Sequence, residues 1–423
     1  MTVTSCHSGP TRREVVRIAG AGLVYLFLAP FARLAEAGKK AKSKLFWVHQ
    51  IPKNPFRGNF GRNHHVGVDC LLHLMGAKNL KFYRSNRTDL LSGPKGMIAA
   101  DDVVLIKVNA QWKYRGCTNS DVIRGLIQSV LEHPDGFTGE VVIIENGQGW
   151  GSLRCNTTTR YSDGMIQANA NNRLHHFEYL VDTVFAEPRV SSYLFDPLRL
   201  RFLDSSDHQD DGYRRIDNVS YPCFTTAAGN RVELREGIWN GSGYSQNLKL
   251  INVPVLKHHD RGGSEITASL KHMYGVLSME DGQFDFRHYD GLGETCGKMF
   301  ALVRAPVLNI IDAIWVSQGS LSGYPASATT QVNQLVASQD PIALDYWAAK
   351  YILYPIDNNE RHHPNFPGIA VWLNDARNRI NRQRALWQPK QGLRVKKANI
   401  KEKRMKLASY SARDFLKDQR SMA

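Results

Sequence analysis

The sequence predicts an α/β fold with a mixed, mostly parallel sheet, flanking helices and two lobes around a crevice. The main observation is that apolar strands such as VVLIKVN (103–109) and EVVIIENG (140–147) alternate with helical patterns. Strands that are apolar almost throughout are typical of parallel sheets covered on both faces. The length of 423 residues and the 42% hydrophobic content suit two lobes and exclude a disordered chain.

The expected strands are short runs of apolar and β-branched residues. They cover residues 45–51, 80–84, 101–109, 140–147, 248–256, 306–315 and 331–338. Between residues 101 and 147 the chain predicts a strand, a helix and a second strand, which is the pattern of a parallel α/β unit. Residues 188–247 show no such alternation and are expected to be irregular or antiparallel β structure.

The expected helices carry apolar residues at helical spacing and begin or end at suitable residues. They cover residues 66–76, 119–133, 173–185, 265–278, 341–353 and 367–386. Gly76 suits the end of the first helix, and Asn119 or Ser120 can cap the second. The Gly-, Asn- and Thr-rich residues 148–172 predict a long loop after a strand, where functional residues are often found.

The net charge of +15 resides at the two ends of the chain. Residues 1–44 carry a net +6 and residues 390–423 a net +8, which leaves +1 for residues 45–389. A nearly neutral body does not predict a nucleic-acid partner. The basic tail, residues 389–423, is expected to be a solvated helix or a frayed end, with peripheral contact to an anionic membrane as the alternative.

Residues 1–37 have the organisation of a cleavable export leader. Arg12 and Arg13 precede an uncharged run, residues 18–32, and the small residues of Ala35-Glu36-Ala37 suit cleavage. The paired arginines resemble the twin-arginine signal, although Val15 stands where that signal usually has Phe. We therefore expect the twin-arginine export machinery as a partner, a periplasmic or other extracytoplasmic location, and an α/β domain over residues 38–388.

Export in the folded state hints at a metal or organic cofactor that is loaded beforehand. The cysteines that remain after removal of the leader are Cys70, Cys117, Cys155, Cys223 and Cys296. None lies within a C-x-x-C spacing, so the sequence has no iron–sulfur or zinc-knuckle motif. One or two disulfides are compatible with an oxidising compartment, but the pairing cannot be deduced from the sequence.

Polar side chains stand at the ends of several expected strands. In open α/β sheets the carboxyl ends of the strands face the ligand crevice. Lys107, Asn109, Glu145, Lys257, His258 and Asp312 occupy such positions. Each of them taken alone could be an ordinary solvated loop residue, and their recurrence at one expected edge is what indicates a site.

The segment VPVLKHHDRGGSEITASLKHMYGV (253–276) is the sharpest local signal. It predicts a strand end, a Gly-Gly turn and a helix capped by Ser264, an arrangement that can hold an anion. Lys271 lies on an apolar stretch of that helix and needs a partner, such as Asp312, an anionic substrate or a cofactor. A buried structural Lys–Asp pair is the alternative.

Histidine pairs occur at 64/65, 175/176, 258/259 and 362/363. Adjacent strand residues point to opposite faces, so one pair rarely supplies two ligands to one metal. His258 is the expected general base or metal ligand, because its pKa lies near working pH. The chain contains no H-E-x-x-H, G-x-S-x-G, P-loop or G-x-G-x-x-G motif, which excludes the common hydrolase and nucleotide-binding signatures.

An ordered set of segments over residues 101–351 resembles the family called domain of unknown function 362. These segments are VVLIKVN (103–109), Cys117-Thr118, VVIIENG (141–147), INVPVLKHH (251–259), SLKHMYGVLS (269–278), LNIIDAI (308–314) and ASQDPIALDYWAAK (337–350). The resemblance implies site positions at Lys107, Asn109, Thr118, Lys257, His258, Lys271, Asp312, Asp340 and Asp345. Some members of that family carry clustered cysteines, which this chain lacks. The step from Lys257-His258 to Lys271 also resembles a short segment of nickel-pincer lactate racemases.

Two hypotheses of function follow. The first is an exported enzyme that acts on a small anionic or hydroxylated substrate, in which Lys257 and Lys271 fix negative charge, His258 moves a proton and Asp312 orients a lysine or binds a metal. Lys107, Asn109, Thr118, Glu145, Asp340 and Asp345 would bind the substrate. The second is a non-catalytic periplasmic or envelope protein that binds a ligand in the same crevice. A purely structural role of the strand-end lysines is a third possibility.

Overall fold

The computed structural model describes residues 42–56, 61–147, 149, 151–158, 161–162, 164–259, 265–278, 288–289, 291–392 and 397–422. The predicted leader, Asp260 and the expected cap Ser264 lie outside the described residues. Ser43–Ala423 form a single compact unit, so the structure does not divide the α/β body into the two lobes that were expected.

The main sheet is mixed and mostly parallel, as predicted. Its strands run in the order β19-β1-β18-β17-β14-β4-β5-β8, and β15 pairs with β17 and β16. The bounds are β1 (Ser43–His49), β4 (Val103–Lys107), β5 (Glu140–Glu145), β8 (Val190–Leu194), β14 (Leu248–Asn252), β15 (Val255–His258), β16 (Ile266–Thr267), β17 (Leu308–Ser317), β18 (Thr330–Ser338) and β19 (Met405–Ser411). Strand β18 is antiparallel to both of its neighbours.

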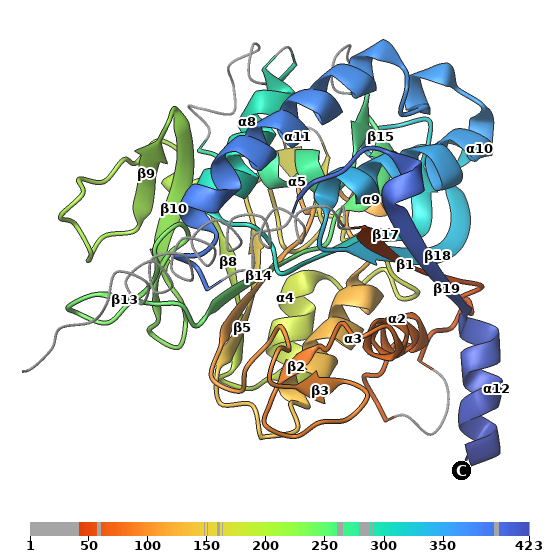
Figure 1. Ribbon diagram of the computed structural model, residues 1–423, viewed down its shortest axis with the longest axis horizontal. Helices are drawn as coiled ribbons and strands as arrows, with labels where there is room; N and C mark the ends of the chain where they lie inside the picture. Colours follow the sequence, from red (N-terminus) through yellow and green to blue (C-terminus); the bar gives the residue numbers. More distant parts are fainter. Residues whose placement is uncertain are drawn as a thin grey trace, which may run out of the picture. The chain divides into compact units, whose positions relative to one another are not determined.

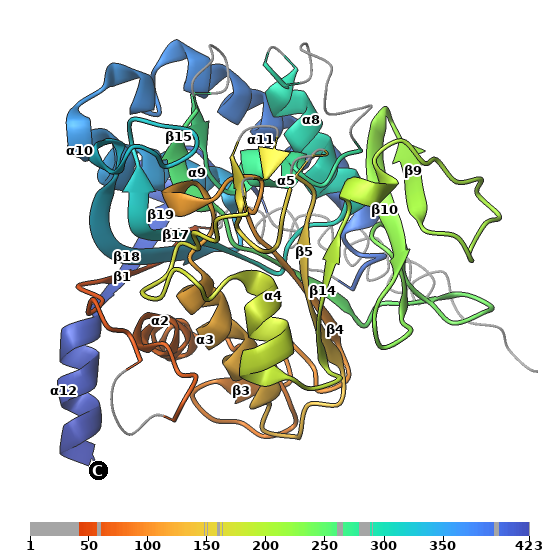
Figure 2. The same cartoon turned by 180° about the vertical axis from the view of Figure 1, so that it is seen from behind.

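Helices cover both faces of this sheet (Figures 1 and 2). On one face lie α2 (Val66–Ala77), α3 (Ser120–Leu131) and α4 (Phe177–Tyr179), and on the other lie α5 (Ser269–Tyr274), α8 (Leu292–Lys298), α9 (Pro341–Ala348) and α11 (Pro367–Trp387). Side chains of β4 alternate between two hydrophobic cores: Val103 and Leu105 belong to one, and Val104 and Ile106 to the other. This two-residue period explains why a strand covered on both faces is apolar throughout.

Helix caps fix where several helices begin. The side chain of Asn119 accepts hydrogen bonds from the N–H groups of Asp121 and Val122 at the start of α3, which confirms the predicted cap. Asp340 does the same for α9, where Pro341 occupies the first turn. The sequence predicted the Asn119 cap, whereas Asp340 was expected to be a residue that binds the substrate.

A second, antiparallel sheet consists of β13 (Tyr244–Ser245), β12 (Gly237–Trp239), β11 (Arg231–Glu233), β10 (Val219–Thr225) and β9 (Gly212–Ile216), in that order. It accounts for most of the region predicted to be irregular or antiparallel. Short strands β2 (Tyr83–Arg84) and β3 (Ser92–Gly93) form a small parallel pair, and β6 (Thr157–Thr158) and β7 (Tyr161–Ser162) an antiparallel one.

Two segments differ from the expected elements. The helix predicted from residue 265 begins at Ser269, because Ile266 and Thr267 pair with β15 as strand β16. The basic tail, expected to be a solvated helix or a frayed end, supplies β19, which pairs in parallel with β1, and then α12 (Ala412–Met422). Most residues of β19 (MKLASYS) are exposed or half-buried, Leu407 among the exposed ones, and its sequence lacks the apolar run that identified the inner strands.

No helix in the part of the chain that the structure describes combines the length and apolar character needed to cross a membrane.

Candidate functional site

Lys107 and Glu145, which end the neighbouring strands β4 and β5, form a buried ion pair. The Lys107 ammonium lies 2.9 Å from Glu145 Oε1 and also donates to the carbonyl of Val108 at 2.7 Å. Glu145 accepts further hydrogen bonds from the N–H groups of Ala110 and Asn146. The sequence placed both residues at the carboxyl edge of the sheet, and the structure brings them together there.

The pair continues into a network that includes His272 of α5. Nε2 of His272 lies 3.2 Å from the Lys107 ammonium, and Nδ1 lies 2.6 Å from Oδ1 of Asn252. Burial, followed by the nearby Lys107 charge, holds the pKa of His272 well below its usual range. A neutral His272 therefore donates from Nδ1 to Asn252 and accepts from Lys107. Neither His272 nor Asn252 was among the predicted site residues.

Lys257 lies at the end of β15 and is 2% exposed. Its ammonium donates to the carbonyl of Gly116 at 2.7 Å, in the short helix η1 (Tyr114–Gly116) that follows β4. Burial lowers the pKa of Lys257 to about 7, and Cys117 and Glu145 act against that shift. Such a lysine exchanges a proton near neutral pH, which an exposed lysine does not.

Asn109 and Thr118 fasten η1 to the sheet. The Thr118 hydroxyl accepts from the Asn109 N–H at 2.8 Å and donates to the Val253 carbonyl at 2.8 Å. The side chain of Asn109 accepts from the N–H of Val255 at 3.0 Å. Both predicted residues thus lie beside Lys257 and hold the link between β14 and β15 against η1.

Asp312 of β17 was expected to orient a lysine or bind a metal. Its carboxylate oxygens accept from the N–H groups of Asn119 and Ile314, at 2.7 and 3.0 Å. Burial raises its pKa to about 7, and the two N–H groups and then the nearby Arg115 charge oppose that rise. The charged side chain that acts on the pKa of Asp312 is therefore Arg115 of η1, and not the lysine that was expected.

Asp340 and Asp345, two further predicted site residues, hold helix starts. Asp340 caps α9 and also accepts from Ser43 and from the N–H of Asn399. Asp345 accepts from the N–H groups of Ser269 and Leu270 at the start of α5. Each carboxylate is saturated by local donors, so the described contacts assign structural roles to both.

His258 stands at the head of a chain of three side chains. Its Nδ1 lies 2.9 Å from Nε2 of His362, and Nδ1 of His362 lies 3.2 Å from Oδ1 of Asp357. An ionised carboxylate can only accept a hydrogen bond, so His362 carries its proton on Nδ1 and donates it to Asp357. Nε2 of His362 then accepts a hydrogen bond from the Nδ1–H of His258.

Lys271 pairs with a histidine in the described structure. Its ammonium lies 2.7 Å from Nε2 of His288 and 5.6 Å from the centre of the Tyr274 ring. The His288 ring in turn packs 5.1 Å from that of His259. The expected pairing of Lys271 with Asp312 is not seen, because Asp312 faces the N–H groups near η1. Burial, followed by the charges of Lys271 and, further down, Lys257, holds the pKa of His259 well below its usual range, so the two lysines lie near the same histidine.

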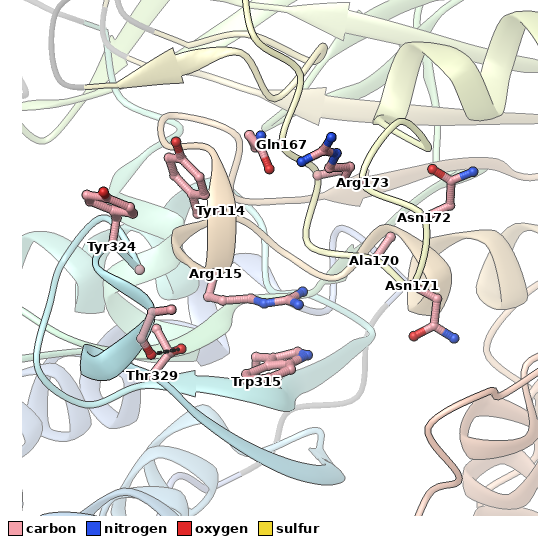
Figure 3. Close-up of a pocket in the computed structure, with 13 residues that line it drawn as sticks. Tyr114, Arg115, Gln167, Ala170, Asn171, Asn172, Arg173, Trp315, Tyr324 and Thr329 are labelled. Atoms are coloured by element: carbon pink, nitrogen blue, oxygen red, sulfur yellow. Dashed lines mark hydrogen bonds between the residues drawn. The ribbon is translucent and has the colours of Figure 1, made fainter.

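A pocket of about 610 Å³ opens on the other side of η1 (Figure 3). It lies between η1, the loop that follows β5, and the end of β17 with the loop after it, which is the carboxyl edge of these parallel strands. Such edges are where ligands bind in α/β sheets. The described lining residues are Tyr114, Arg115, Gln167, Ala168, Ala170, Asn171, Asn172, Arg173, Trp315, Gly323, Tyr324, Ala326 and Thr329.

The pocket lining combines positive charge, amides and aromatic rings. Arg115 lies 4.1 Å over the Trp315 ring and donates to Oδ1 of Asn169 at 2.7 Å. In Figure 3 its guanidinium extends over Trp315 toward the loop that carries Ala170. The rings of Tyr114 and Tyr324 pack 5.0 Å apart. Of the described lining residues none is Asp or Glu, so the lining favours an anion.

Sequence reasoning named none of the lining residues individually, although the predicted functional loop 148–172 contains five of them: Gln167, Ala168, Ala170, Asn171 and Asn172. Arg115 and Tyr114 stand in a run, KYRGC, with no secondary-structure signal, and Trp315 sits inside a strand that reads as core. For η1 the available signal was its position a few residues after the end of β4. None of the predicted catalytic residues His258, Lys271, Lys257 and Asp312 is among the described lining residues.

Residues 241–350 match the family model called Domain of unknown function (DUF362). The match confirms the resemblance over the segment from β13 to the end of α9, which contains Lys257, His258, Lys271 and Asp312. Searches of curated proteins and of solved structures returned no match.

Among the described residues no three or more His, Cys, Asp and Glu side chains converge in a group that could hold a metal ion. The chain His258–His362–Asp357 is linear, with each member bonded to the next.

Proposed function

We propose that the protein binds a small anionic ligand that also carries hydroxyl groups and a ring, in the pocket beside η1. An acidic monosaccharide is the simplest molecule of this class. The observation that carries the proposal is the composition of the lining: two guanidinium groups, three side-chain amides, three aromatic rings and no carboxylate among the described residues. Guanidinium groups bind carboxylates in a bidentate manner, amides bond hydroxyls, and aromatic faces pack on sugar rings.

The arrangement of Arg115 supports a binding role. Its guanidinium lies over the Trp315 ring and donates to Asn169, so little side-chain freedom is lost when an anion binds. Burial lowers the pKa of Arg115, but an arginine side chain still stays charged at neutral pH. The described clusters of buried lysine and histidine lie outside the pocket lining, and this separation favours binding without chemistry.

Calorimetric titration with D-glucuronate and D-glucose tests the proposal, since the two sugars differ in the carboxylate. Glucuronate is expected to bind and glucose to bind much more weakly. Replacement R115A should weaken glucuronate binding by at least tenfold, because a charged hydrogen-bond partner is lost. The matched control R382A removes an exposed arginine of α11 and should leave affinity unchanged. Equal affinity for both sugars, or no effect of R115A, would count against the proposal.

A second candidate function, a proton-transfer enzyme, is favoured by the chain His258–His362–Asp357. A base that is oriented by a second histidine and a carboxylate is the arrangement that general-base catalysis uses. Exchange of the hydrogen next to the carboxylate of D-glucuronate in D₂O, followed by NMR, tests this candidate. Exchange by the protein that is lost in H258N supports it, and absence of exchange rejects it for this ligand.

The location remains part of the proposal. We infer export on the basis of the predicted leader, residues 1–37, and propose that the ligand is met in the periplasm. Cell fractionation of the full chain and of the R12K/R13K variant tests this, because the twin-arginine pathway depends on the pair. Retention of both proteins in the same fraction would exclude this route.

A further inference from the structure

Two cysteines far apart in the sequence lie together behind the pocket. Cys117 follows η1 directly, and Cys155 belongs to the loop after β5. Both side chains are 0% exposed, and the Cys155 thiol donates a hydrogen bond to the Cys117 sulfur. The structure describes both as free thiols. Neither residue has a part in the ligand-binding function proposed above.

Backbone hydrogen bonds already hold the two cysteine-bearing segments in register. The N–H of Lys113, four residues before Cys117, donates to the carbonyl of Thr157, two residues after Cys155, at 2.9 Å. Gln167 bridges them, because its N–H donates to the Cys155 carbonyl at 3.0 Å and its carbonyl accepts from Tyr114 at 2.8 Å. A bond between the sulfurs would thus join segments that backbone hydrogen bonds already hold side by side.

The two thiols are not equivalent. Burial raises the pKa of Cys117, but the hydrogen bond from Cys155, the Asn169 N–H and the charges of Lys257 and Arg115 together bring it below its ordinary value. The pKa of Cys155 lies well above its ordinary value, chiefly because of its hydrogen bond to Cys117 and its burial. Cys117 is also bonded to the Tyr114 carbonyl at 3.1 Å, so its proton has a defined position. The lower pKa of Cys117 favours it over Cys155 as the attacking thiol.

We propose that Cys117 and Cys155 are a peroxide-reactive pair that closes to a disulfide behind the ligand pocket. The Cys117 sulfur attacks one oxygen of hydrogen peroxide, the O–O bond breaks, and the departing hydroxide takes up the thiol proton and leaves as water. The Cys155 sulfur then attacks the sulfenic acid of Cys117, the S–O bond breaks, and the hydroxide leaves with the Cys155 proton as a second water. The two sulfurs are oxidised and the peroxide is reduced to two waters. A small oxidant is required because both thiols are buried.

Peptide mapping of the full chain tests this inference. The reduced protein is treated with hydrogen peroxide at neutral pH, free thiols are alkylated at intervals, and the peptides are analysed by mass spectrometry without reduction. The expected product is a peptide pair joined through Cys117 and Cys155 that lacks two hydrogen atoms and separates with dithiothreitol. The buried cysteines Cys70, Cys223 and Cys296 serve as internal references, because burial raises the pKa of each.

Variants separate the two roles. In C155S, Cys117 should accumulate as a sulfenic acid that dimedone traps, and in C117S, Cys155 should stay reduced. K257M should slow the loss of the Cys117 thiol roughly tenfold, because one unit of thiol pKa changes the thiolate fraction by that factor. K95M, which removes an exposed lysine, should have no effect.

The wild-type rates decide the matter even if a variant fails to fold. Oxidation of Cys117 no faster than that of Cys223 and Cys296 would overturn the inference. So would a linkage of Cys117 to any other cysteine, or its direct conversion to sulfinic acid without a link to Cys155. Failure of glucuronate to bind would leave this result untouched, because the thiol reaction is measured without ligand.

Discussion

Lys257 donates a 2.7 Å hydrogen bond to the carbonyl of Gly116 and thereby ties the end of β15 to η1. The same short helix presents Tyr114 and Arg115 to the pocket on its other side. A buried lysine of the sheet edge therefore sits directly behind the pocket wall. The polar residues predicted at the strand ends thus contact the wall of the pocket, whereas most of the residues that line it come from η1 and the loops.

Lys257→Met is expected to change how stability depends on pH. The pKa of Lys257 falls from 10.5 when unfolded to about 7 when folded, so folding favours its neutral form. The resulting destabilisation is absent above pH 10.5, grows as the pH falls to about 7 and is constant below that. The stability of K257M minus that of the wild type should therefore decrease from pH 7 to pH 10, by about 1.4 kcal/mol for each pH unit.

Urea unfolding at several pH values measures this difference, and the lost hydrogen bond to Gly116 adds only a constant offset. Exposed Lys95→Met is the matched control and should give a flat difference. If the stability difference for K257M also does not change with pH, burial does not lower the pKa of Lys257.

Lys107→Met is expected to destabilise the protein by about 3–5 kcal/mol, because it leaves the Glu145 carboxylate buried without its cation. Glu145→Gln should cost less, since the amide oxygen can still accept from Lys107. The double variant K107M/E145Q should be more stable than the sum of the single losses predicts. Additive losses in urea unfolding would contradict a direct coupling of the two groups.

Asp345→Ala is expected to destabilise the fold by about 1–3 kcal/mol and to leave glucuronate affinity unchanged. The substitution leaves the N–H groups of Ser269 and Leu270 at the buried start of α5 without their acceptor. Thermal unfolding and calorimetry on the same sample measure both quantities. A loss of affinity with unchanged stability would instead return Asp345 to the ligand site.

The strand order of the sheet core could be anticipated in part from the sequence. VVLIK and EVVIIE are apolar because cores lie on both faces, and the helix between them makes the two strands parallel and adjacent. The same logic could not find β19, whose sequence MKLASYS has no apolar run, because its place in the sheet depends on pairing with β1. The start of α5 was misjudged for a related reason: pairing with β15 takes Ile266 and Thr267 out of the helix.

The candidate site divides in the same way. Strand ends are fixed by hydrophobic patterning, so Lys107, Glu145 and Lys257 could be expected at one edge, and the structure places them there. Loop side chains such as Arg115 obtain their place from tertiary contacts, here the ring of Trp315, and no local pattern announces them. Capping by Asp340 and Asp345 uses the same residue types as a binding site, so sequence alone could not separate the two roles.

Asp357→Ala is expected to change the proton positions of His258 and His362 at pH 8. Burial lowers the pKa of His362, so it is neutral at this pH, and Asp357 holds its proton on Nδ1. Nε2 of His362 then accepts from Nδ1 of His258, and both rings should show the Nδ1–H tautomer by ¹⁵N NMR. Without the carboxylate nothing fixes the His362 proton, and a mixture of tautomers should appear on both rings. The ring of His49 is the internal control, because it packs on Trp47 in β1 and should not respond. Identical spectra for the two proteins would mean that Asp357 does not orient the pair.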